Sequence, residues 1–226
     1  MTMFIGLQEN NRLIIGGDSA VCKGDGNKNI RVREDYFDKL FCHNGVIYFI
    51  GGVAEFGKKL KENIVSGITN LYDLQYICLN LKKELNITDE ILEVDIWLNN
   101  NGEITYYLLN SANNFKPIRD VIPKRETEIK VSGFNSNAVL GKVANKYYRC
   151  PEGKIMPYEI IKQTFDEIAS PEVGGVCKLL IVECRGINGI NVDTHYYIID
   201  DKYSTKSKEE LTKMLMQHLE EVERKW

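Results

Sequence analysis

The sequence predicts an α+β fold in four layers, an αββα sandwich in which two stacked antiparallel sheets are flanked by pairs of helices. Two observations lead to it. Segments with strand-like apolar patterns occur as neighbouring pairs joined by turns, and segments with helical periodicity also come in pairs. The resulting order is strands, two helices, strands, two helices, strands and a final helix. This order lacks the strand–helix–strand alternation of a parallel sheet, so antiparallel hairpins are favoured.

The first part of the chain contains two predicted hairpins. A polar turn at 9–11 joins the strands of the first hairpin and leaves Asp18 at the end of its second strand. The polar, glycine-rich segment 22–29 is predicted as a loop. Asn44-Gly45 is a strong turn signal within the second hairpin. The four strands are residues 4–7, 13–15, 36–41 and 46–50.

The pattern becomes helical after Gly51-Gly52. Apolar residues recur every four positions from Phe56 to Ile68, which is the spacing of one helix face. The remaining predicted elements are helices at 71–85, 138–147 and 158–168, strands at 91–98, 104–109, 128–131, 177–182 and 191–199, and an amphipathic helix at 206–225.

The composition indicates one globular domain spanning residues 1–226. A net charge of −3 gives no reason to expect nucleic acid or an anionic membrane as a partner. No apolar run approaches the roughly 20 residues of a membrane span, and the N-terminus lacks the pattern of a signal peptide. We therefore expect a cytoplasmic protein.

The six cysteines are scattered without metal-ligand spacing. They are predicted to be buried, small apolar residues in a reducing compartment, and no metal or cofactor is expected. The adjacent Cys42-His43 is a weaker candidate for a nucleophile and its base.

Thr2 directly follows the initiator methionine. Methionine before so small a residue is normally removed, which would leave Thr2 with a free α-amine beside its own hydroxyl. Nucleophile and base would then share one residue. The pKa of an α-amine, about 7.7–8.0, suits a general base at working pH.

Four further motifs, taken with Thr2, resemble those of one known family. Asp18 follows Thr2 by sixteen residues. The other motifs are Asp38-Lys39-Leu40-Phe41, Gly51-Gly52 before the first helix, and Gly174-Gly175-Val176 before a late strand. Their order and spacing resemble the proteasome β-type family of N-terminal nucleophile hydrolases, which includes HslV and the Anbu proteins. The likeness extends over nearly the whole chain.

The resemblance implies a role for each catalytic candidate. Thr2 would supply the hydroxyl nucleophile and the α-amine. Lys39 would lower the pKa of the hydroxyl through its charge or assist proton transfer, and Asp18 would hold Lys39 charged and oriented. The backbone N–H of Gly52 would stabilise the tetrahedral oxyanion.

The resemblance also implies the nature of the substrate and the assembly. Val21, Phe37 and Ile50 would line the pocket beside the scissile bond, which favours an apolar residue on the acyl side. Peptide or protein substrates would be cleaved inside a homo-oligomeric ring, with an ATP-driven unfoldase as an optional partner of the kind HslV-type members have.

Three positions at which the family has residues supporting the threonine depart from its pattern. Phe134 stands where the family has a serine, unless a one-residue slip brings in Ser132 or Ser136. Ser170 and Val173 stand where the family has an aspartate and a serine. Those family residues support the threonine and its amine.

Three alternatives therefore stay open. The departures favour a catalytically degenerate, scaffold-like subunit. The same chemistry would also serve an amidase acting on a small amide. A binding module without chemistry is the third alternative. If Met1 is retained, Thr2 has no free amine and the proposed base is absent.

Overall fold

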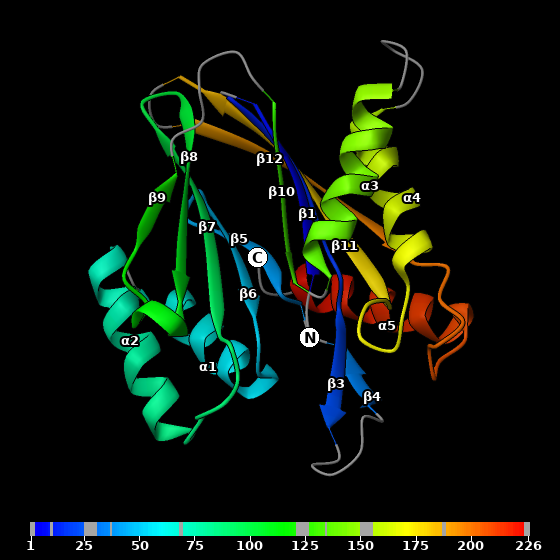
Figure 1. Ribbon diagram of the computed structural model, residues 1–226, viewed down its shortest axis with the longest axis horizontal. Helices are drawn as coiled ribbons and strands as arrows, with labels where there is room; N and C mark the ends of the chain where they lie inside the picture. The colour runs from blue at the N-terminus through cyan, green and yellow to red at the C-terminus, as the bar shows by residue number, and fades with distance from the viewer. Residues whose placement is uncertain are drawn as a thin grey trace.

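The computed structural model describes residues 3–9, 11–24, 31–36, 38–67, 70–120, 127–133, 135–149, 156–186 and 189–223. It confirms the α+β class. Two five-stranded antiparallel sheets and five α-helices are formed by these residues. Figure 1 shows the sheets between one helix pair on each side.

The first sheet has the strand order β10-β1-β2-β11-β12. Its strands in chain order are β1 (Met3–Gln8), β2 (Arg12–Gly17), β10 (Glu128–Gly133), β11 (Val176–Arg185) and β12 (Gly189–Ile198). The helices α3 (Ser136–Arg149) and α4 (Pro157–Ile168) cover its outer face. Pro157 stands at the start of α4, where the missing backbone N–H costs nothing.

The second sheet has the strand order β5-β6-β7-β8-β9. Its strands are β5 (Leu40–His43), β6 (Val46–Gly51), β7 (Glu93–Asn100), β8 (Glu103–Asn110) and β9 (Ile118–Asp120). The helices α1 (Ala54–Val65) and α2 (Leu71–Glu84) pack on its outer face. The side chain of Asn70 caps α2 by accepting from two backbone N–H groups.

Three buried apolar clusters separate the four layers. The cluster under α1 and α2 includes Phe56, and the cluster under α3 and α4 includes Phe165. Between the sheets, Phe4 of β1 meets Phe49 of β6 and Trp97 of β7, with ring centroids 4.9 and 5.2 Å apart. The strands alternate so that one face meets the helices and the other meets the opposite sheet.

The prediction of a loop at 22–29 is partly wrong, because the strand β3 (Ala20–Gly24) extends into this range. The strands β3 and β4 (Arg31–Tyr36) form a separate two-stranded antiparallel sheet within the described part of the chain, and this hairpin projects beyond the two larger sheets. Neither strand has an apolar residue at every second position, so the sequence pattern gave no strand signal here. The predicted strand at 36–41 is likewise divided: β4 ends at Tyr36, and β5 begins at Leu40.

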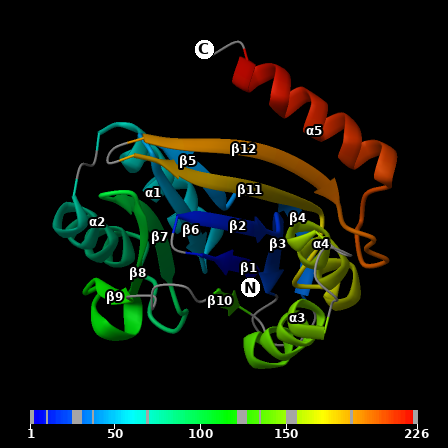
Figure 2. The ribbon, with the colours of Figure 1, turned by 90° about the horizontal axis from the view of Figure 1, so that it is seen from above.

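The terminal helix α5 (Lys208–Glu223) lies beside β12 in Figure 2. One face of it, with Leu211, Met214, Leu215 and His218, borders a cavity next to the sheets. Its predicted amphipathic character therefore corresponds to an inward face. Among the described helices, none has the length and apolar content needed to cross a membrane.

Candidate active site

A buried ion pair joins two of the predicted catalytic residues. Asp18 follows the last residue of β2, and Lys39 precedes the first residue of β5. The Nζ of Lys39 lies 3.1 and 3.2 Å from the two carboxylate oxygens of Asp18. The side chains of Lys39 and Asp18 are 4 % and 0 % exposed. The structure thus brings together two residues that are 21 positions apart in the chain.

The Asp18 carboxylate is also held by the backbone. The N–H of Met3 donates to its Oδ1 at 2.8 Å, and the N–H of Ala20 donates to its Oδ2 at 3.1 Å. The N–H of Asp18 in turn donates to the carbonyl of Met3 at 3.2 Å. Met3 is the residue directly after Thr2, so the ion pair is fixed to the start of the first strand. Thr2 itself lies outside the described residues.

Lys39 is oriented by more than its ion pair. Its Nζ donates to the carbonyl oxygen of Ala20 at 2.6 Å. The backbone carbonyl of Lys39 accepts from the N–H of Ile50 at 3.0 Å, which anchors Lys39 to β6. A buried ammonium stays favourable only when it is paired and hydrogen-bonded, and both conditions are met here.

Gly52 lies at the end of β6, immediately before α1. Its φ of +107° is a conformation that favours glycine. A Cβ at this position would lie 2.8 Å from the carbonyl oxygen of Ile91 and 2.8 Å from the side chain of Leu92. Gly52 is exposed, and its N–H has no hydrogen-bond partner within the described part of the chain. The N–H is thus available to an incoming oxygen atom.

The predicted pocket residues are only partly placed. Val21 lies on β3 and is half-buried. Ile50 is buried in the apolar cluster between the second sheet and α1. Phe37 lies outside the described residues. Their joint role as a pocket stays a prediction.

Two of the positions predicted to depart from the family pattern, Ser170 and Val173, lie in a turn before Gly174. The hydroxyl of Ser170 accepts from the N–H groups of Glu172 and Val173, both at 3.2 Å, and so stabilises its own turn. Val173 is buried and apolar. Phe134 lies outside the described residues.

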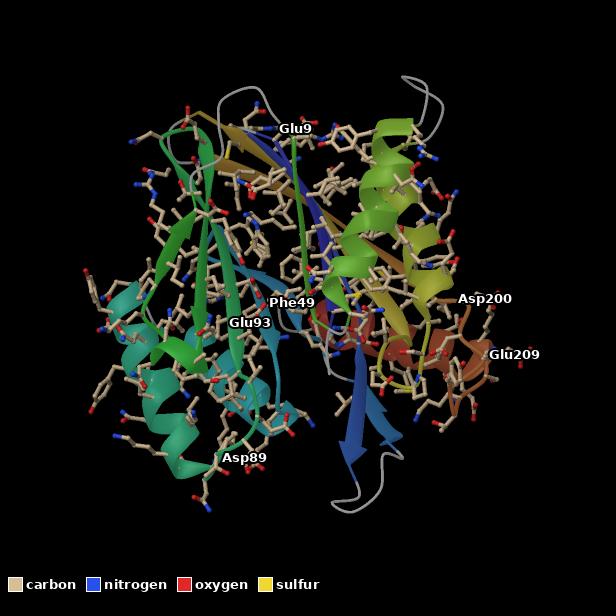
Figure 3. All side chains as sticks on the ribbon, in the orientation of Figure 1. Glu9, Phe49, Asp89, Glu93, Asp200 and Glu209 are labelled. Carbon is tan, nitrogen blue, oxygen red and sulfur yellow. The ribbon has the colours of Figure 1, made fainter. Side chains whose placement is uncertain are left out.

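Sequence reasoning did not anticipate the partner of Ser132. The Ser132 hydroxyl on β10 donates to the carboxylate of Glu93 on β7. Ser132 pairs with Phe4, and Glu93 pairs with Gly51, so this contact links the sheets beside the strand that leads to Gly52. Figure 3 shows Glu93 near Phe49 in the middle of the view, whereas Asp89 lies at the periphery. The two residues are 39 positions apart, and no local pattern could have joined them.

A second ion cluster was also not anticipated. The Oδ2 of Asp38 lies 3.1 Å from the Nζ of Lys61 on α1 and 3.0 Å from the Nζ of Lys178 on β11. Burial favours a raised pKa for Asp38, but Lys178 and Lys61 outweigh it and lower the pKa overall. Burial opposes the charge of Lys178, yet Asp38 raises the pKa of this lysine. The cluster connects the first sheet to the helix on the second.

The cysteines show a mixed outcome. Cys78 and Cys177 are buried as predicted, but Cys42 is exposed, since it alternates outward at the edge strand β5. The thiol is still partly shielded from water by its neighbours, and this desolvation raises the pKa of Cys42. The thiolate is the reactive form, so this shift disfavours the Cys42-His43 nucleophile.

The chain matches no model of a known protein family and no curated protein. Among the described residues, no group of three or more His, Cys, Asp or Glu side chains could hold a metal ion.

Proposed function

We propose that this protein is a threonine-type N-terminal nucleophile hydrolase with a proteasome β-like fold, acting on peptide bonds. One observation carries the proposal. The buried Asp18–Lys39 pair is hydrogen-bonded to the N–H of Met3, one residue after Thr2. A charged pair costs free energy to bury, and buried ionisable groups with specific partners are characteristic of functional sites.

The proposed mechanism begins with removal of Met1. The freed α-amine of Thr2 accepts the proton of the Thr2 hydroxyl as its oxygen attacks the substrate carbonyl. The Lys39 ammonium stabilises the negative charge that develops on the attacking oxygen. The N–H of Gly52 donates to the tetrahedral oxyanion, an interaction whose loss costs roughly 10²–10³ in rate in other enzymes. The amine then protonates the leaving group, and water hydrolyses the ester formed on Thr2.

Asp18 acts through Lys39 in this proposal. Its carboxylate contacts both the ammonium and the Met3 N–H, so it fixes the distance between Lys39 and the first strand. Low exposure strengthens such electrostatic interactions relative to the same groups in water. The apolar character of Val21 and Ile50 supports a preference for an apolar residue on the acyl side. Ring assembly and an unfoldase partner belong to the proposal through the resemblance alone.

A second candidate is a catalytically degenerate scaffold subunit. The observation in its favour is the use of Ser170 for its own turn and the buried, apolar Val173. This candidate predicts an intact fold without covalent chemistry.

Intact mass spectrometry of untagged protein, before and after a peptide epoxyketone, tests the proposal. This electrophile closes a ring with a hydroxyl and an adjacent amine, so it reports both groups of Thr2. We expect loss of the Met1 mass and one adduct per chain. Thr2→Ser should keep the adduct and Thr2→Ala should abolish it, while both substitutions leave a small residue for methionine removal.

Lys39→Met should slow adduct formation by about 10²-fold or more, on the scale of other lost electrostatic contacts. Lys59→Met is the matched control, because Lys59 lies on α1 and pairs with the exposed Glu84. Retained Met1, or a free Thr2 that forms no adduct, would overturn the proposal and favour the scaffold.

A further inference from the structure

A cavity of about 330 Å³ lies at one edge of the sandwich, where β12 is the last strand of the first sheet and β5 is the end strand of the second. In Figure 2, α5 runs along this edge on the outer side of β12. Its residues Leu211, Met214, Leu215 and His218 line the cavity. Their spacing is that of one helix face, so the outer wall is an apolar stripe that ends in an imidazole.

The inner wall of the cavity is polar. Lys178 of β11 and Tyr196 of β12 are paired across the sheet, and their side chains therefore share one face. The Nζ of Lys178 lies 5.8 Å from the centre of the Tyr196 ring, and its side chain is 15 % exposed. Asp38 also lines the cavity and accepts from Lys178 at 3.0 Å.

We propose that this cavity binds a small organic monoanion, with its carboxylate at Lys178 and Tyr196 and a short aliphatic tail along the stripe of α5. An ammonium and a phenol hydroxyl both donate to carboxylate oxygens. The leucine and methionine side chains remove an aliphatic tail from water. The cavity is also lined by Asp18 and Lys39 of the candidate active site, but the inference does not require Thr2 to act as a nucleophile.

Size and charge define the ligand class. The cavity has the volume of roughly 11 liquid waters and lies at the small end of ligand pockets. Lys39, Lys61 and Lys178 line the cavity together with Asp18 and Asp38, so the formal charge of these five side chains is +1 and is balanced by one negative charge. A carboxylate with about five carbons beyond it meets both conditions.

Hexanoate titrated into the full chain tests the site directly. We expect saturable 1:1 binding by calorimetry with a Kd on the order of 1 mM or tighter. In protein labelled with ¹³C at the methionine methyl groups, the Met214 signal should shift on binding. Met216 is the internal control, because it is two residues away on α5 and 54 % exposed.

Two comparisons test recognition of the charge. Hexanamide, which has the same tail without the charge, should bind the wild-type protein at least tenfold more weakly. Lys178→Met should weaken hexanoate binding by about tenfold or more, the scale of a hydrogen bond to a charged group. Lys59→Met should leave binding unchanged, since Lys59 pairs with Glu84 away from the cavity.

Three results would overturn the inference, and all three are measured on the wild-type protein. They are the absence of saturable hexanoate binding, an unshifted Met214 signal at saturation, and equal affinity for hexanoate and hexanamide. A negative result here would leave the epoxyketone test of Thr2 unaffected, so the two proposals fail separately.

Discussion

Removing the ammonium of Lys39 should destabilise the protein strongly. Lys39→Met keeps much of the aliphatic stem but leaves the Asp18 carboxylate, 0 % exposed, without its counter-charge. Breaking a buried ion pair from one side typically costs 3–5 kcal/mol. The N–H groups of Met3 and Ala20 still donate to the carboxylate, so we expect a loss at the lower end, about 3 kcal/mol.

A double-mutant cycle separates the pair from the rest of the site. Asp18→Asn alone leaves the Lys39 ammonium buried without an anion and should cost a similar free energy. The double variant Asp18→Asn with Lys39→Met removes both charges together. Because the two residues are in direct contact, the double variant should lose about 2 kcal/mol less than the sum of the single losses.

Urea denaturation followed by tryptophan fluorescence gives these free energies of unfolding, provided the slope against urea is unchanged. A loss below about 1 kcal/mol for Lys39→Met would refute the reasoning, since exposed ion pairs give values of that size. Additive losses in the double variant would likewise show that the two charges are not coupled.

Two further predictions concern the backbone and a buried acid. Gly52→Ala should destabilise the protein by about 1 kcal/mol or more beyond Gly67→Ala, because both glycines have positive φ but only Gly52 lacks space for a Cβ. Equal losses in urea denaturation would contradict this. Burial, and then the nearby Glu93, raise the pKa of Asp95 well above its usual value. The stability that Asp95 contributes is thus present below pH 3.8 and is lost as the pH rises through its folded-state pKa. Asp95→Asn should flatten this decline in urea midpoints measured from pH 4.5 to 7.5, and an unchanged slope would contradict it.

Much of the secondary structure could be predicted from the sequence. The pairing of helices and the hairpins followed from apolar periodicity, which reflects the face that each element buries. The hairpin of β3 and β4 could not be found this way, because neither strand has apolar residues at alternate positions. The edge strand β9 was missed because it has three residues, all exposed, which is too short for a periodic pattern.

The sequence by itself predicted most elements of the fold and named Asp18, Lys39 and Gly52 as candidates. Only the tertiary structure decided what these residues touch. Stacking of the two sheets creates the buried ion pair, the link between Ser132 and Glu93, and the cluster around Asp38. These contacts join residues 21, 39 and 140 positions apart. Local patterns record which face of an element is buried, but the partner on the opposite layer is fixed by how the layers pack.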